Sequence, residues 1–166
     1  MDNIEEQRAY VTQYFKKYSA HPLSDNSIID IYKCIINNIV TETKDSMTYL
    51  YYGRYYRDKK EYDNMMKYYL MAIELGNYNA CNSLAAYYET QKDHDNILKY
   101  YFMGIEHGNN MSMHHLGSYY KSLKDYDNML KYYLMAIEHG NHISMNHLAS
   151  YYYNNENFDN AKKYYL

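Results

Sequence analysis

The chain has 166 residues and a formal net charge of −3, with 17 lysines and arginines against 20 aspartates and glutamates. This length allows one domain, and the lack of any block of five basic residues disfavours charge-driven binding to nucleic acid or to an anionic membrane. Charged or amide residues interrupt every apolar run, which excludes a membrane span of about 20 residues. We expect an intracellular, cytoplasmic protein, because the start lacks an export signal and two cysteines, Cys34 and Cys81, are too few for a disulfide framework.

Residues 1–44 do not share the pattern of the rest of the chain. Apolar residues recur at helical spacing over 4–19, Pro22 interrupts them, and a second apolar face extends from residue 24 to about 43. We expect a helix pair here that caps the array that follows. A docking hairpin for another protein is the alternative.

From residue 45 to 166 the sequence is a tandem repeat. KEYDNMMKYYLMAIELGN starts at Lys60, KDHDNILKYYFMGIEHGN at Lys92 and KDYDNMLKYYLMAIEHGN at Lys124, and a shortened copy, ENFDNAKKYYL, starts at Glu156. The copies follow one another with a period of about 32 residues, which predicts a stack of repeated helical units.

Each unit is predicted to contain two helices, A and B. Helix A is expected near 46–58, 78–90, 110–122 and 142–154, and helix B near 62–75, 94–107, 126–139 and 158–166. Short connections force neighbouring helices to run antiparallel. Buried positions recur along helix A at i, i+3, i+4 and i+7, as in Met113, Leu116, Gly117 and Tyr120.

Local signals mark the ends of helix B. Asp93 and Asp125 are expected to cap its start, and the glycines that recur at one position of each unit, Gly76, Gly108 and Gly140, are expected to end it. A column of small residues on helix A, which includes Gly117, is expected to face a second small column on helix B, which includes Gly104.

The junction between units resembles a known repeat family. MGIEHGNNMSMHHLGSYY (residues 103–120) and MAIEHGNHISMNHLASYY (135–152) resemble the helix B to helix A junction of Sel-one-like repeats, a branch of the tetratricopeptide superfamily. This resemblance implies an all-α, right-handed α-solenoid of antiparallel helix pairs. The chain departs from the family by lacking a glycine-containing loop between helices A and B. Its composition also resembles repeat proteins of large A/T-rich DNA viruses, which would place it in the host cytoplasm.

We find no catalytic constellation, cofactor motif or metal-ligand set, and therefore predict a protein that is not an enzyme. His115 and His147 occupy one position in adjacent repeats, where stacked helices stand about 8 to 10 Å apart, too far for shared coordination without further ligands. The many tyrosines are read as packing residues. A base-stacking platform for RNA is the sharper alternative, which the acidic charge balance disfavours.

Beside the buried positions of helix A runs a stripe that changes from unit to unit. The resemblance implies that helices A line a concave face, so we expect this stripe to bind a peptide or protein segment, with neutral drift of exposed residues as the alternative. Its members are Leu50, Arg54, Arg57, Asn82, Ala86, Glu89, His114, Ser118, Lys121, Asn146, Ser150 and Tyr153. A second functional alternative is assembly, in which the chain forms a homo-oligomer through an apolar C-terminal end around Leu148 and Tyr152.

Overall fold

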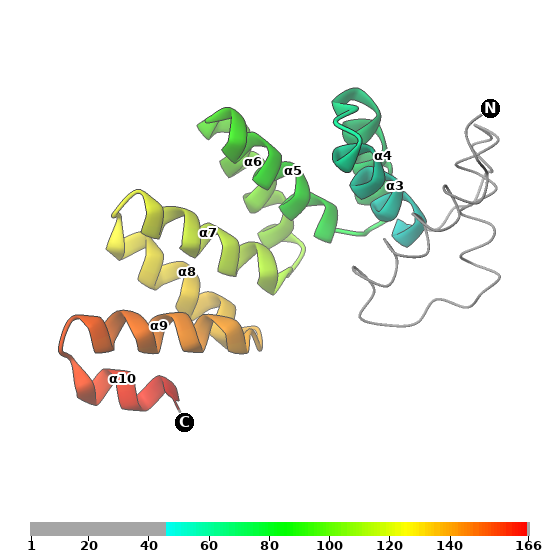
Figure 1. Cartoon of the computed structure of the whole chain (residues 1–166). Helices are drawn as coiled ribbons and strands as arrows, with labels where there is room; N and C mark the ends of the chain where they lie inside the picture. Colours follow the sequence, from blue (N-terminus) through cyan, green and yellow to red (C-terminus); the bar gives the residue numbers. More distant parts are fainter. Residues whose placement is uncertain (1–45, 166) are drawn as a thin grey trace, which may run out of the picture. The chain divides into compact units, whose positions relative to one another are not determined.

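The computed structural model describes residues 46–165, which form eight helices and no strand (Figure 1). The chain divides into two units, Met1–Lys44 and Asp45–Leu166, of which the second contains all of the described helices. The helix pair expected over residues 4–43 lies outside the described residues.

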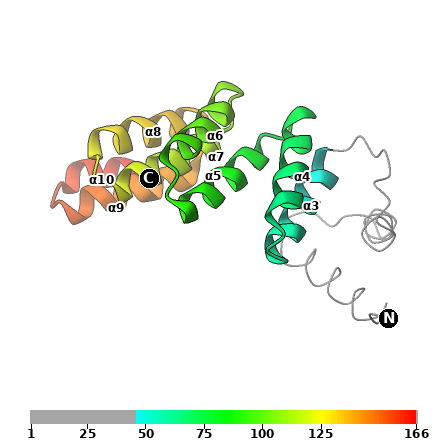
Figure 2. The same ribbon diagram turned by 90° about the horizontal axis from the view of Figure 1, so that it is seen from above.

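The eight helices alternate between A and B along the chain. Helices A are α3 (Ser46–Asp58), α5 (Asn79–Gln91), α7 (Asn110–Ser122) and α9 (His142–Asn154). Helices B are α4 (Tyr62–Glu74), α6 (His94–Glu106), α8 (Tyr126–Glu138) and α10 (Phe158–Tyr165). Each helix packs beside the one that follows it, and α5 also contacts α7 (Figures 1 and 2). The predicted all-α solenoid of antiparallel helix pairs is confirmed.

One compact turn both ends helix B and begins the next helix A. Gly108 has a φ of 72°, a left-handed conformation that suits glycine, and Asn109 follows it directly. The Asn109 side chain then accepts a hydrogen bond of 3.0 Å from the backbone N–H of Ser112 and so caps α7. Gly140 and Asn141 repeat this arrangement before α9, which explains why the connection between units is so short.

The start of helix B is capped as the sequence predicts. Asp93 accepts a hydrogen bond of 3.1 Å from the backbone N–H of Asn96, and Asp125 does the same with Asn128. In all four units, the second residue before helix B adopts a left-handed conformation although it is not glycine. These residues are Lys60, Lys92, Lys124 and Glu156, with φ between 57° and 61°.

Inside each unit the ring of a tyrosine on helix B packs directly against a small residue of helix A. A Cβ atom built on Gly117 would lie 2.6 Å from Cδ1 of Tyr133, and one built on Gly53 would lie 2.3 Å from Cδ1 of Tyr69. The expectation that the two small columns face each other is therefore wrong. The small column of helix B instead receives the next helix A, since a Cβ on Gly104 would lie 2.0 Å from Oγ of Ser112.

A pair of parallel tyrosine rings closes each unit near its A to B turn. The ring planes of the pairs 56–68, 88–100, 120–132 and 152–164 lie within 10° of parallel, with centroids 5.3 to 5.9 Å apart. A lysine Nζ lies 5.1 to 5.6 Å from the centroid of the helix B ring in every pair. Such cation–π contacts stabilise an exposed site by about 0.5 to 1 kcal/mol.

Replacing Lys124 by glycine is expected to stabilise the fold by about 0.5 to 1 kcal/mol. A left-handed conformation costs a residue with a Cβ atom about 1 to 2 kcal/mol, and glycine avoids this cost. Part of the stabilisation is lost again, because glycine has greater conformational freedom in the unfolded chain. Thermal unfolding followed by circular dichroism would measure the change. Lys121→Gly is the matched control, because it places glycine inside α7 and is expected to destabilise. A lower melting temperature for Lys124→Gly would contradict the assignment of strain to this turn.

Replacing Gly117 by leucine is expected to destabilise the fold by about 1 to 3 kcal/mol, because the side chain must displace the ring of Tyr133. Gly117→Ala should cost less, since Ala85 and Ala149 occupy the same column in neighbouring units. Urea unfolding of the two variants would give both values. Equal stability of the leucine variant and the parent would show that the helices are packed differently.

Candidate functional site

The candidate site is the stripe on helices A that the sequence singles out, here called the helix A stripe. The structure leaves half of its members exposed: Ala86, Glu89, Lys121, Asn146, Ser150 and Tyr153. Four more are partly exposed: Arg54, Arg57, Asn82 and Ser118. Leu50 and His114 are buried, with 2 % and 5 % of their surfaces exposed, so the expectation of a solvent-facing position is wrong for these two.

Leu50 and His114 are buried because their column faces the next helix A. Nδ1 of His114 lies 2.9 Å from Oγ of Ser144 in α9. One unit earlier, Oγ of Ser112 donates a 2.6 Å hydrogen bond to Oδ1 of Asn82. At the first junction the equivalent positions hold Leu50 and Ala80, which are both buried and apolar. This column therefore joins neighbouring units, with a different matched pair at each junction.

A row of tyrosine hydroxyl groups reaches the helix A stripe from helices B. The Tyr101 hydroxyl donates a 2.9 Å hydrogen bond to Oε1 of Glu89, and Oη of Tyr133 lies 3.0 Å from Oγ of Ser118. Tyr101 and Tyr133 are themselves almost fully buried. Burial and the nearby Glu89 carboxylate raise the pKa of Tyr101 well above its usual value, so the hydroxyl stays protonated and acts as a donor.

These tyrosines belong to the site although sequence reasoning treated them as packing residues. A signal was present, because Tyr69, Tyr101, Tyr133 and Tyr165 recur at one position of helix B. The hydroxyl groups contact members of the helix A stripe, and these partners are not the same residue type in every unit. The hydroxyl oxygen of Tyr69 is buried.

The charge of the helix A stripe changes sign along the array. Arg54 lies over the Tyr51 ring, with Cζ 5.6 Å from its centroid, and Arg57 pairs with Asp58 at 3.0 Å. The next unit presents the Glu89 carboxylate, and the third presents Lys121. The stripe therefore offers positive, negative and positive groups in successive units.

Three histidines gather where α7, α8 and α9 meet. The ring of His114 lies 5.3 Å from that of His115, 4.8 Å from that of His147 and 5.6 Å from that of Tyr133, measured between centroids. Burial and the two neighbouring imidazoles lower the pKa of His114 to about 4. Within residues 46–165, no three His, Cys, Asp or Glu side chains are arranged to hold a metal ion.

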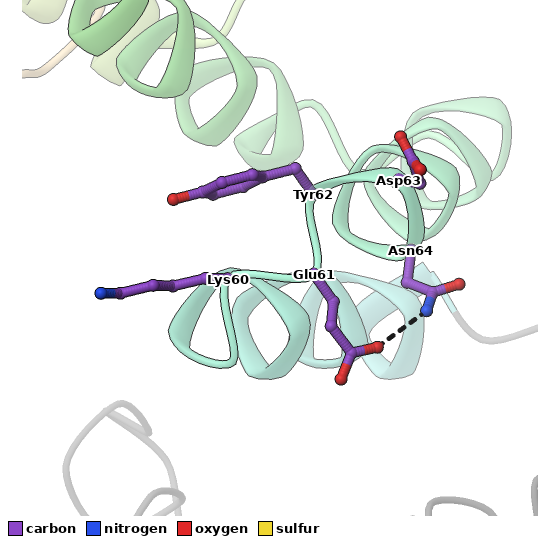
Figure 3. Close-up of a pocket in the computed structure, with 5 residues that line it drawn as sticks. All are labelled: Lys60, Glu61, Tyr62, Asp63 and Asn64. Carbon is purple, nitrogen blue, oxygen red and sulfur yellow. Dashed lines mark hydrogen bonds between the residues drawn. The ribbon is translucent and has the colours of Figure 1, made fainter.

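Two further features of the described residues do not form a reactive or enclosed site. Burial raises the pKa of the Cys81 thiol to about 11, which leaves it protonated and unreactive at neutral pH. An open hollow of about 390 Å³ lies at the turn between α3 and α4 and is lined by residues 60–64. Figure 3 shows Lys60 and Tyr62 extending from it side by side, while Glu61 accepts a hydrogen bond from Asn64.

The structure also bears on membrane insertion. Among the described residues, no helix is both long enough and apolar enough to cross a lipid bilayer.

Acid is expected to weaken the α7–α9 junction. Because the pKa of His114 falls from 6.5 to about 4 on folding, the unfolded chain binds more protons between these values, and stability must decrease as the pH drops through this window. His114→Asn copies the Asn82–Ser112 pair of the preceding junction and should reduce this loss. Melting temperatures at pH 7 and pH 5 would measure the effect, with the exposed His139→Asn as control. An equal acid effect in parent and His114→Asn would contradict the assignment.

Comparisons with known proteins agree with the helix pairs. The family model of the tetratricopeptide repeat matches residues 112–138 and 143–166, which correspond to the third and fourth units and make up less than half of the chain. Among curated proteins, none matches the sequence. The repeated helix pairs and these two matches together support the tetratricopeptide superfamily for this chain.

Proposed function

We propose that the chain is a non-enzymatic protein-interaction module that binds a peptide or protein segment along the helix A stripe. This proposal rests on how the buried and the exposed positions of helix A vary between units. Buried columns such as Leu84, Leu116 and Leu148 repeat, whereas the outermost column of the stripe changes in every unit, from Arg57 to Glu89, Lys121 and Tyr153. Repeats of the tetratricopeptide superfamily generally mediate protein–protein interaction.

The charges of the stripe favour an extended ligand of alternating charge. Helices in direct contact, as α5 and α7 are, stand about 8 to 10 Å apart, which is close to three residues of extended chain at about 3.3 Å each. A segment with an acidic residue near Arg54, a basic one near Glu89 and an acidic one near Lys121 would complement successive units. The tyrosine hydroxyl groups below the stripe fix the orientation of Glu89 and Ser118.

Two finer points belong to the same proposal. The junction sequences favour the Sel-one-like branch, with a unit that is shorter because the glycine-containing loop between helices A and B is missing. We also propose that the protein acts in the cytoplasm, which agrees with the free, buried thiol of Cys81.

Assembly through the end of the array is the second candidate function. Tyr165 is 56 % exposed, whereas its equivalents Tyr69 and Tyr133 are fully buried beneath a following helix A. Tyr153 and Phe158, 57 % and 58 % exposed, lie near the same end. RNA binding is disfavoured further, because the rings of Tyr69, Tyr101 and Tyr133 are buried and cannot stack on bases.

Binding to the helix A stripe can be tested with peptides selected from a displayed random library on the immobilised chain. We expect Lys121→Glu to weaken the binding of the selected peptides at least about tenfold. Replacing an acidic residue of the peptide by a basic one should recover part of the lost affinity. Lys131→Glu makes the same charge change on helix B and should have no effect. The proposal would be contradicted if Lys131→Glu lowered the affinity of the selected peptides and Lys121→Glu left it unchanged.

A further inference from the structure

The outward side of helix B carries the same residues in three successive units. Positions i, i+4, i+7 and i+11 lie on one side of a helix, and here they hold an aspartate, a lysine, a large apolar residue and a glutamate. We call these residues the helix B stripe. Its members, all exposed, are Asp63, Lys67, Leu70 and Glu74 in α4; Asp95, Lys99, Phe102 and Glu106 in α6; and Asp127, Lys131, Leu134 and Glu138 in α8.

Folding explains only part of this pattern. An aspartate near the helix start is favourable to the helix dipole, and each lysine lies over a tyrosine ring. The glutamates, however, stand in the last turn, where the dipole disfavours negative charge. Among the described residues, none of the three glutamates lies within 4.0 Å of a cationic nitrogen.

The fold explains the apolar members of the stripe only in part: the Phe102 ring lies 6.3 Å from the Tyr132 ring of α8, measured between centroids. Leu70, Phe102 and Leu134 are 43 %, 38 % and 37 % exposed. Exposed positions of this kind usually tolerate substitution with little effect on stability. The helix A stripe, copied in the same units, has diverged at its exposed positions. The repeated helix B stripe therefore points to a contact outside the fold, with a partner that presents matching groups at the same spacing.

We propose that the helix B stripe binds the helix B stripe of a second copy of this chain, with the paired helices antiparallel about a two-fold axis. Lys99 and Glu106 are seven residues apart, about 10.5 Å along α6, and Phe102 lies near their midpoint. When two α6 helices run antiparallel, the lysine of each copy faces the glutamate of the other across an apolar centre. The pattern is thus complementary to itself, as a two-fold interface requires.

The flanking helices α4 and α8 carry the same four residue types as each other, and they differ from α6 in having leucine in place of Phe102. Twelve exposed side chains per copy are fewer than the roughly 20 to 30 residues a side of a standard interface. The dimer is therefore weak and reversible. It leaves the helix A stripe accessible, so that one dimer presents two binding stripes to a ligand.

Sedimentation velocity of the full chain over a roughly hundredfold range of concentration tests the proposal. The parent should associate as its concentration rises. Lys99→Glu places like charges opposite Glu106, and Glu106→Lys places like charges opposite Lys99, so each should weaken association about tenfold or more. The double variant restores complementary charges and should recover association. A mixture of the two single variants should associate more strongly than either alone.

Circular dichroism of each variant checks the fold, and Lys121→Glu controls for the change in net charge. Should Lys99→Glu unfold, Glu106→Lys carries the test by itself, since it removes an unfavourable charge from the helix end. A parent that stays monomeric throughout, or a double variant as weak as the single variants, overturns the proposal. Loss of association with Tyr165→Lys but not with Lys99→Glu also overturns it, because the contact would then lie at the end of the array.

Discussion

The packing of one helix B tyrosine against a small residue of helix A organises the structure from core to surface. The ring of Tyr133 fits over Gly117 so closely that a Cβ atom on that glycine would collide with it. The same side chain ends in a hydroxyl group that lies beside Ser118 and within 3.2 Å of Nδ1 of His147 in the next unit. One residue therefore sets the distance between the helices of a unit, contacts the following unit and orients the polar groups of the candidate site.

Contacts between units are chemically distinct even though the units are near copies. Asn82 and Ser112 form a polar pair at the second junction and His114 brings an ionisable group to the third, whereas the equivalent positions at the first junction hold the buried, apolar Leu50 and Ala80. Because the partners at each junction match, a change on one side requires a change on the other. Units of this array are therefore not interchangeable, and among the described junctions it is the third that contains a buried imidazole, that of His114.

The two faces of the array differ in how they vary. Helix A presents Arg54, Glu89 and Lys121 in succession, which suits discrimination among ligands, whereas helix B presents one pattern three times, which suits a partner with the same period. A repeat protein can keep both faces, because the buried columns alone hold the stack together. This separation of roles is consistent with a module that binds one protein on helices A and a second copy of itself on helices B.

Within residues 46–165, the sequence by itself determined the helix bounds to within one or two residues, and the helix ends at Asp93, Asp125 and Gly108, because these depend on signals local to a turn or a helix. It also indicated the helix A stripe as a candidate binding surface. Only the tertiary structure decided that Leu50 and His114 are buried, that Gly117 faces Tyr133, and that buried tyrosines supply hydroxyl groups to the site. A column at the edge of a buried stripe is covered or exposed according to how closely the neighbouring unit approaches. That distance is set by side chains of the neighbouring unit, which helical periodicity within one unit does not encode.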